Sequence, residues 1–258
     1  MSLVFVGLSR KNITYASSHT HRNYEVILNM EGSGRILIGS QALSFGPGTI
    51  HIIPPDTPHI KTSDTGFQDI YFQTTVLYPN TKQAQSKDPL CLQDDPGKTV
   101  ETMLQLLFSR YCTKPKNDSV LQSMYELILQ LLEDLCEREL YPPEVEEIIH
   151  KLTISLNDPD ISVNEILQQT GYSKDHIRRL FISATHMTPQ KYLTDLRITY
   201  AKKLLKQSSH NHLSVADIGA MCGYYDAKYF SRVFKAETGF SPTEYICTSA
   251  QKKQAPGL

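Results

Sequence analysis

The sequence lacks the features of secreted and membrane proteins. No apolar run approaches the roughly 18 residues of a membrane-spanning helix. The short apolar run at residues 2–8 has no basic lead and no cleavage-like site, so it does not predict a signal peptide. The five cysteines are scattered and contain no CxxC pair, which indicates neither a disulfide framework nor a zinc knuckle. We therefore expect an unexported protein of a reducing cytoplasm, without a membrane partner.

A strong net charge is also missing, since the 258 residues carry a formal charge of −1. The charge is nevertheless uneven along the chain. Residues 161–253 contain 13 Lys and Arg against 7 Asp and Glu, which gives +6 and leaves −7 for the rest. So small a surplus argues against a protein that covers nucleic acid without sequence preference. Any affinity for nucleic acid has to come largely from specific contacts.

One signal occurs twice in the last hundred residues. Each copy begins with Ser-Val-x-Glu/Asp-Ile, passes a Gly-Tyr pair, continues with an apolar stripe ending in Phe, and closes with Ser/Thr-Pro-x-x-Tyr. The first copy runs from Ser162 to Tyr192 and the second from Ser214 to Tyr245. The offset is 52 up to the Gly-Tyr pair and 53 afterwards. This repetition predicts two copies of one structural unit.

Each copy predicts two helices around a tight bend. Ser162 and Glu165 place a hydroxyl and a carboxylate three residues apart, where they satisfy free amides of a first helical turn, and the second copy repeats this pair. Gly171 and Gly223 follow about two turns later, where a residue tolerant of positive φ ends the helix. A second helix then begins in each copy. Such a pair of helices is typical of the helix-turn-helix, whose second helix lies in the major groove.

The second helix of each copy buries its apolar stripe and leaves a polar face outward. Arg and Lys on that face can address guanine O6 and N7, and Asp can accept from cytosine N4. A merely solvated helix face is the alternative, and a single copy would not exclude it. Among the candidates, Arg179 and Arg232 occupy equivalent positions in the two copies. The full set of predicted base-facing residues is Lys174, Asp175, Arg178 and Arg179 in the first copy and Ala227, Lys228, Ser231 and Arg232 in the second.

A further helix is predicted between the two copies. It begins at Thr188 and Pro189 and keeps apolar positions as far as Leu205. Counted from Pro189 it has 17 residues, which corresponds to roughly 25 Å at 1.5 Å per residue. Successive major-groove segments on one face of B-DNA lie roughly 34 Å apart, so one chain could engage two of them.

These residues resemble the AraC/XylS family of transcription regulators, whose DNA-binding part consists of two helix-turn-helix units joined by a linker helix. The resemblance covers residues 144–247. His186 departs from it, because it stands where the family usually has Gly, and we expect a less tight bend there. The motifs that carry the resemblance are Gly171-Tyr172-Ser173, Arg179-x-Phe181, Arg197 with Ala201 and Leu204-Leu205, Ile218-Gly219, Gly223-Tyr224, Tyr229-Phe230, Phe234-Lys235 and Gly239-x-Ser241-Pro242-x-x-Tyr245.

The N-terminal part of the chain has a different periodicity. Short β-like runs are separated by Gly and Pro turns and predict a small β-barrel; they lie at residues 26–30, 35–38, 49–53 and 68–75. After a polar connector at 78–97, apolar residues recur with helical spacing and predict two amphipathic helices over 99–113 and 119–140.

The predicted barrel carries one cluster of candidate ligands: His19, His21, Glu25 and His59. The first three share parity along a strand and so point to one face, and His59 follows a turn. The pattern His-x-His-x3-Glu-x6-Gly, with Gly-x5-Pro-x-Asp-x2-His later, resembles the two cupin motifs. A cupin barrel with this set typically holds a divalent metal through three imidazoles and one carboxylate, and Zn, Fe, Mn or Ni suits such donors.

The chain departs from the cupin pattern at three positions that are not ligands: Ile13, Asp56 and Ser63. Sensor domains of AraC-type regulators also resemble cupins, and many bind organic effectors without a metal. Two interpretations of the cluster therefore stay open, a divalent-metal site or polar groups that line an effector pocket.

We expect an α+β chain of three parts. Residues 1–95 would form a cupin-like, effector-sensing barrel and residues 96–141 a helical segment for linkage and dimerisation. Residues 142–258 would form an all-α DNA-binding domain of two helix-turn-helix units joined by a linker helix. The predicted protein is a bacterial cytoplasmic homodimer that binds double-stranded promoter DNA and a small effector such as a sugar or metabolite. If it activates, RNA polymerase is a partner.

Two alternatives keep the same sequence features. One is a metal-responsive regulator, in which the ion is the effector. The other is a metal-dependent cupin enzyme with a DNA-binding appendix. We expect the chain not to be an enzyme, because regulation needs only that the effector bind one arrangement of the protein better than another.

Overall fold

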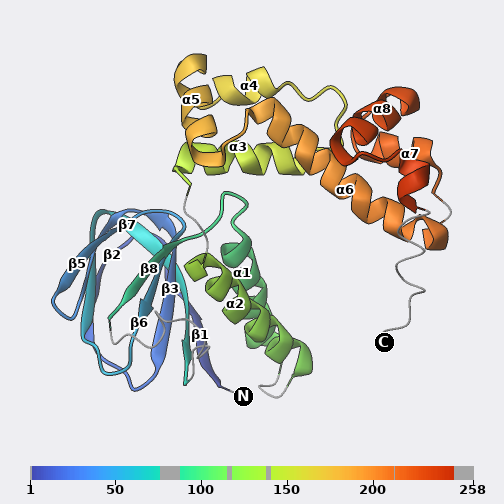
Figure 1. Cartoon of the computed structure of the whole chain (residues 1–258). Helices are drawn as coiled ribbons and strands as arrows, with labels where there is room; N and C mark the ends of the chain where they lie inside the picture. Colours follow the sequence, from blue (N-terminus) through green and yellow to red (C-terminus); the bar gives the residue numbers. More distant parts are fainter. Residues whose placement is uncertain (1, 76–87, 115–117, 138–140, 212, 247–258) are drawn as a thin grey trace. The chain divides into compact units, whose positions relative to one another are not determined.

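The computed structural model describes residues 2–75, 88–114, 118–137, 141–211 and 213–246 (Figure 1). The chain divides into two compact units, Met1–Leu140 and Tyr141–Leu258. No helix among the described residues is long and apolar enough to cross a bilayer.

The first unit is built on a curled antiparallel sheet of eight strands within the described residues. The long strand β7 is its centre, because it pairs with β1, β2, β3 and β4, while β6 joins β3 to β8. The strands are β1 (Leu3–Leu8), β2 (Ile13–His19), β3 (Tyr24–Gly32), β4 (Gly34–Ile38), β5 (Gln41–Phe45), β6 (Thr49–Ile53), β7 (His59–Thr74) and β8 (Leu90–Gln93). This confirms the predicted cupin-like β architecture.

Both faces of the sheet are covered at β6 and at the middle of β3, because every residue of β6 and residues 25–29 of β3 are buried. On β3, Val26 and Leu28 face one core, and Ile27, between them, faces another. The second core lies on the inside of the curl and includes Phe45 and Phe67. Residues that share parity with Ile27 therefore point into the curl.

Two helices, α1 (Thr99–Thr113) and α2 (Ser119–Glu137), pack their apolar faces on the core that contains Val26. The Asp94 carboxylate accepts the backbone N–H groups of Val100 and Glu101 at 3.1 and 2.9 Å and so fixes the start of α1. Both helices were predicted at these positions, although 138–140 lies outside the described residues. The predicted polar connector was partly wrong, since it contains β8, and its residues 78–87 lie outside the described part.

The second unit is all α. Its helices are α3 (Pro143–Ile154), α4 (Val163–Gln168), α5 (Lys174–Thr185), α6 (Pro189–Asn211), α7 (Val215–Met221) and α8 (Ala227–Thr238). They form two separate cores. The first joins α3, α4, α5 and the beginning of α6, and the second joins the rest of α6 with α7 and α8 (Figure 1). The predicted linker helix is confirmed as α6, and it runs six residues beyond Leu205.

Candidate nucleic-acid interface and sensor site

The first helix of each helix-turn-helix pair begins at the predicted cap. At α4, the Ser162 hydroxyl accepts the backbone N–H of Glu165 at 3.3 Å. At α7 the capping box is complete: the Ser214 hydroxyl accepts the Asp217 N–H at 3.1 Å, and the Asp217 carboxylate accepts the Ser214 N–H at 2.9 Å. Several backbone N–H groups at a helix start have no partner within the helix. These side-chain contacts satisfy two such groups at α7 and one at α4.

The bend that follows depends on glycine in both pairs. Gly171 and Gly223 have φ values of 77° and 76°, a conformation that other residues rarely adopt. Both second helices then start at a side-chain cap. Ser173 accepts the His176 N–H at the start of α5, and Asp226 accepts the N–H of Tyr229 at the start of α8. The local sequence thus dictates both turns.

The second helices end alike, which corrects one expectation. His186 has φ 58° and ψ 15°, and Gly239 at the matching position has φ 81° and ψ −11°. Each N–H donates at 2.8 Å to the carbonyl four residues earlier. The predicted less tight bend after α5 is therefore wrong. Histidine adopts the left-handed conformation that glycine adopts after α8, at a conformational cost that glycine avoids.

The outward faces of α5 and α8 carry the predicted residues. In α5, Ile177 and Phe181 are fully buried, and in α8 Phe230 and Phe234 are, so each helix is anchored along one side. The predicted base-facing residues lie on the opposite side. Six of them are exposed and the other two half-buried: Lys174, Asp175, Arg178, Arg179, Lys228 and Arg232, then Ala227 and Ser231.

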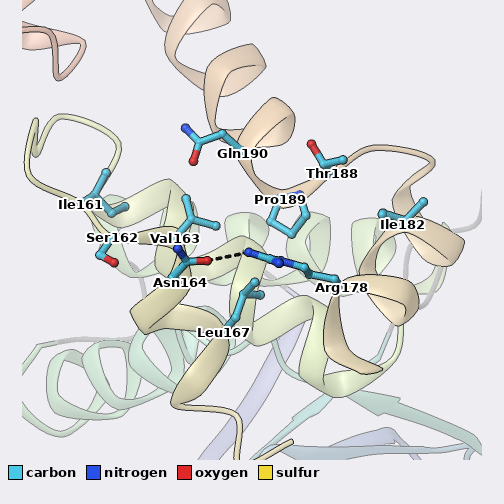
Figure 2. Close-up of a pocket in the computed structure, with 10 residues that line it drawn as sticks. All are labelled: Ile161, Ser162, Val163, Asn164, Leu167, Arg178, Ile182, Thr188, Pro189 and Gln190. Atoms are coloured by element: carbon cyan, nitrogen blue, oxygen red, sulfur yellow. Dashed lines mark hydrogen bonds between the residues drawn. The ribbon is translucent and has the colours of Figure 1, made fainter. Parts of the chain in front are cut away.

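The arginines of α5 are held in different ways. Arg178 donates through Nη2 to the Asn164 Oδ1 at 2.7 Å, across a pocket of about 550 Å³ between α4, α5 and the start of α6 (Figure 2). Arg179 donates through Nε to the carbonyl of Asp175 one turn earlier, at 3.2 Å. Asn164 could not be predicted from the sequence, because the contact joins two helices and no spacing rule predicts it.

On α8 the side chains at the corresponding positions are a short serine and an arginine that stacks on a tyrosine ring. The Ser231 hydroxyl donates to the carbonyl of Ala227 at 2.8 Å, so its proton is turned back on its own helix. The guanidinium of Arg232 lies 5.2 Å from the ring centre of Tyr229, in cation–π contact. The spacing of three residues on one helix is the signal that could have predicted this pair.

In the first unit, the four candidate ligands of the curled sheet come together. His19 ends β2, His59 begins β7 opposite it, and Glu25 lies on β3. With His21 they offer ligand atoms that all lie within 4.8 Å of one another. Glu25 and His59 are buried, His21 is half-buried and His19 is exposed, so the cluster reaches from the interior to the surface.

The three imidazoles of the cluster are oriented by backbone carbonyls. The Nδ1 atoms of His19, His21 and His59 lie 2.8, 2.7 and 3.1 Å from the carbonyl oxygens of residues 17, 23 and 57. A carbonyl can only accept, so each Nδ1 carries a proton and each Nε2 is the atom left to face Glu25 or, once it is deprotonated, a metal. Metal-binding histidines are usually fixed in this way.

Glu25 joins the histidines. Its Oε2 lies 3.1 Å from Nε2 of both His21 and His59. Burial alone would raise the pKa of the Glu25 carboxyl, but the two imidazoles together lower it. Burial would lower the pKa of His59, and the carboxylate with the Thr57 carbonyl raises it. His59 Nε2 has no hydrogen bond of good geometry within the described part of the chain. Three imidazole nitrogens and one carboxylate fit a divalent metal.

Two family models match the chain. The AraC-like ligand binding domain model matches residues 3–152, and the helix-turn-helix domain model matches residues 155–246. The chain belongs to the AraC family of transcriptional regulators. It is a DNA-binding regulator with an N-terminal ligand-binding domain, as the resemblance predicted.

Several characterised proteins are similar to this AraC-family chain. The HTH-type transcriptional activator RhaR of Escherichia coli strain K12 is 24% identical over 92% of this chain and 89% of its own length. An AraC-type regulator structure from Chromobacterium violaceum is 29% identical over 45% of this chain and 96% of its own, with a TM-score of 0.38. ToxT from Vibrio cholerae is 13% identical over 96% of this chain and 100% of its own, with a TM-score of 0.36.

The AraC-like ligand-binding domain also holds a buried polar group that the sequence analysis missed. Lys61 is 3% exposed and donates to Asp69 at 2.5 Å and to Asn29 at 3.1 Å. Its ammonium also lies 3.7 Å from the ring centre of Phe45. Nearby His51 is fully buried, and burial with the Lys61 charge lowers its pKa to about 4. Their inward parity on β6 and β7 is the signal that could have found them.

Proposed function

We propose that this AraC-family protein activates transcription from promoters that it binds through α5 and α8. The relatives of similar length are transcriptional activators, which supports activation and makes RNA polymerase a partner. One observation carries the proposal for the interface. Both helices begin at a side-chain cap and end at a left-handed residue, both bury a Phe at the equivalent position, and both leave an arginine-bearing face exposed.

The chemistry of those faces supports direct reading of base edges. Arg179 and Arg232 are assigned to guanine O6 and N7, with Lys174 and Lys228 beside them for guanine or phosphate. Asp175 is assigned to cytosine N4, since a carboxylate accepts from an amino group and is repelled by phosphate.

The test is an in vitro selection from random duplexes with the full-length protein. We expect enrichment of a sequence with two conserved segments about one helical turn apart, one for each unit. Affinity for the selected duplex should fall steeply with salt, because phosphate contacts release counterions. If no duplex is enriched above random competitor, sequence-specific binding by α5 and α8 is wrong.

We propose further that residues 96–141 pair two copies of the chain through α2. Val120 and Leu127 are 48% and 42% exposed, and Met124 and Leu131 continue their spacing of four, three and four residues. Such an apolar seam suits a second helix of the same kind. Light scattering should give a dimer mass for the wild type and a monomer mass for Leu127→Glu. A wild type that is monomeric at micromolar concentration would contradict pairing.

We also propose that the effector binds inside the curled sheet of residues 1–95. Lys61, Asn29 and Asp69 are buried there and bonded to one another, and both ring nitrogens of His51 are without a hydrogen bond among the described residues. These groups favour a polar effector such as a sugar or metabolite. The effector has to favour one state of the regulator by differential affinity and need not be transformed.

A second candidate function is metal-responsive regulation through His19, His21, Glu25 and His59. Two observations favour it: the Nδ1 atoms of all three imidazoles are held by backbone carbonyls, and the four ligand atoms lie within 4.8 Å of one another. The ion would be held by three imidazoles and a carboxylate and would act as a Lewis acid or as the signal itself.

Metal analysis of untagged protein tests this candidate. We expect about one bound Zn, Fe, Mn or Ni per chain, lost in His21→Ala and in His59→Ala. His51→Ala is the control, since this imidazole lies in the same sheet outside the cluster. Equal metal content in all four proteins would refute ligation. Operator affinity that changes with the metal would separate metal sensing from a purely organic effector.

A further inference from the structure

The two helix-turn-helix units have separate cores, and Arg197 of α6 connects them. This arginine is 9% exposed and lies near the middle of the linker helix. Its Nε donates to the Leu156 carbonyl at 2.8 Å, and its Nη2 donates to the carbonyl of Asp158 at 2.7 Å. Both acceptors belong to the segment between α3 and α4, in the first helix-turn-helix unit.

The same guanidinium contacts the second helix-turn-helix unit. Its Cζ lies 5.3 Å from the ring centre of Tyr224, which belongs to the turn between α7 and α8. The neighbouring Gly223 leaves no room for a side chain, because a Cβ there would lie 2.5 Å from the Leu156 oxygen and 2.6 Å from Arg197 Nη2. Glycine is therefore required for this close approach as well as for its φ of 76°.

A further bond joins the two units at the same place. The Tyr225 hydroxyl donates to the Asp160 carboxylate at 2.5 Å. We call these contacts the clamp: Arg197 with the carbonyls of Leu156 and Asp158, Tyr224, Gly223, and the Tyr225–Asp160 bond. The clamp ties the turn before α8 to the segment before α4, and these contacts oppose independent rotation of the two helix-turn-helix units about α6.

Arginine is suited to this role in a way that lysine is not. Its planar fork donates in two fixed directions while its face stacks on an aromatic ring, and one ammonium cannot reproduce that geometry. Burial lowers the pKa of Arg197, so the protein accepts a desolvation cost at this position. The two bonded carbonyls and the ring compensate that cost.

We propose that Arg197 sets the spacing and rotational phase between α5 and α8 and thereby the separation of the two DNA segments that one chain reads. It is a positioning residue, and the inference rests on the proposed DNA-binding function. Each base pair added between the segments turns the second by about 34° and shifts it by about 3.4 Å. A rigid clamp therefore makes affinity depend sharply on that separation.

The experiment measures affinity of the full-length protein for the selected duplex and for duplexes with one to five base pairs added or removed between the two segments. The wild type should bind the original spacing at least tenfold more tightly than spacings changed by two. Arg197→Met should lose about tenfold on the original spacing and have a nearly flat profile across the others. Arg197→Lys should lie between them.

Two controls separate positioning from other effects. Lys203→Met removes a positive charge from the exposed side of α6 and should keep the sharp profile. Arg179→Ala should lower affinity at every spacing by a similar factor. If Arg197→Met unfolds by circular dichroism, Tyr225→Phe removes only the Asp160 bond and should flatten the profile partially.

The outcomes are distinguishable. If the wild type binds no duplex specifically, the DNA-binding assignment of these faces fails and the inference falls with it. If the wild type binds with a sharp profile, and folded Arg197→Met or Tyr225→Phe keeps that profile unchanged, the role of the clamp is refuted while DNA binding stands.

Discussion

The two helix-turn-helix units share a frame and differ in the residues that this frame presents. In each, a serine caps the first helix, a glycine forms the bend and a side chain caps the second helix. The second helix buries Ile177 and Phe181 in the first unit and Phe230 and Phe234 in the second. On the outward face, however, α5 presents four exposed polar residues, whereas two of the four positions on α8 are the small, half-buried Ala227 and Ser231.

This difference shows that frame and recognition surface are specified by separate residues. Caps, bends and core positions fix where each helix lies, and they leave the outward positions free to vary. We infer that α5 carries more of the base discrimination and that α8 contributes through Arg232 and Lys228. The two units then need a fixed relation to each other, because the second has few contacts with which to find its own register.

The largest effect should come from the matched core variants Phe181→Ala and Phe234→Ala. Both rings are fully buried, so each truncation should cost about 3–5 kcal/mol. Because the two rings belong to separate cores, Phe181→Ala should accelerate amide exchange mainly in α4 and α5, and Phe234→Ala mainly in α7 and α8. Hydrogen-exchange mass spectrometry resolved by helix is the measurement.

The outcome of this experiment bears directly on the comparison. Equal acceleration across all helices from α3 to α8 in both variants would mean one cooperative unit. In that case the two frames are not independent, and the separation of the cores has no thermodynamic meaning.

The next effect should come from the equivalent arginines of the recognition helices. Arg179→Ala and Arg232→Ala should each weaken binding of the selected duplex by about 1–3 kcal/mol, because each removes a base contact. Each should relax preference at one base pair, in a different one of the two segments. Quantitative binding to single-substituted duplexes measures this.

A different pattern would change the assignment. If Arg232→Ala lowers affinity equally for all duplexes and reduces the salt slope by about one, Arg232 contacts phosphate. The second unit would then position the protein on DNA while the first alone discriminates sequence.

Much of the second unit could be predicted from sequence because its signals are local. Caps, bends and the apolar stripe depend on residues within a few positions of one another, as at Ser162 and Gly171. The contacts that cross between elements could not be predicted in this way. The bond from Arg178 to Asn164 and the clamp around Arg197 depend on how helices pack, which no spacing within one helix encodes.

The sensor site shows the same division. His19, His21, Glu25 and His59 do lie together, but the expected parity along one strand is wrong, because His19 ends β2, His21 lies in the connection that follows and Glu25 lies on β3. The orientation of the imidazoles could not be foreseen, because it comes from backbone carbonyls whose direction depends on the fold. Lys61 was missed because a lysine in a strand is usually exposed, and only the curl of the sheet buries it against Phe45.

The smallest effect should come from exchanging the residues that end the two recognition helices. Gly239→His should destabilise the second helix-turn-helix unit by about 1 kcal/mol, since a side chain is disfavoured at positive φ. There is open space around a Cβ at Gly239, so the cost is conformational and not a clash. His186→Gly should stabilise the first unit by less than that, because glycine also gains freedom in the unfolded chain.

Thermal and urea unfolding of the two single variants and the double exchange measure these effects. The double variant should show the sum of the two single changes, because the two sites belong to helices with separate cores. Destabilisation by His186→Gly would mean that the histidine side chain makes a contribution at the end of α5 larger than its backbone strain. The two bends would then be alike in backbone conformation but stabilised differently, because the His186 side chain would stabilise the bend after α5.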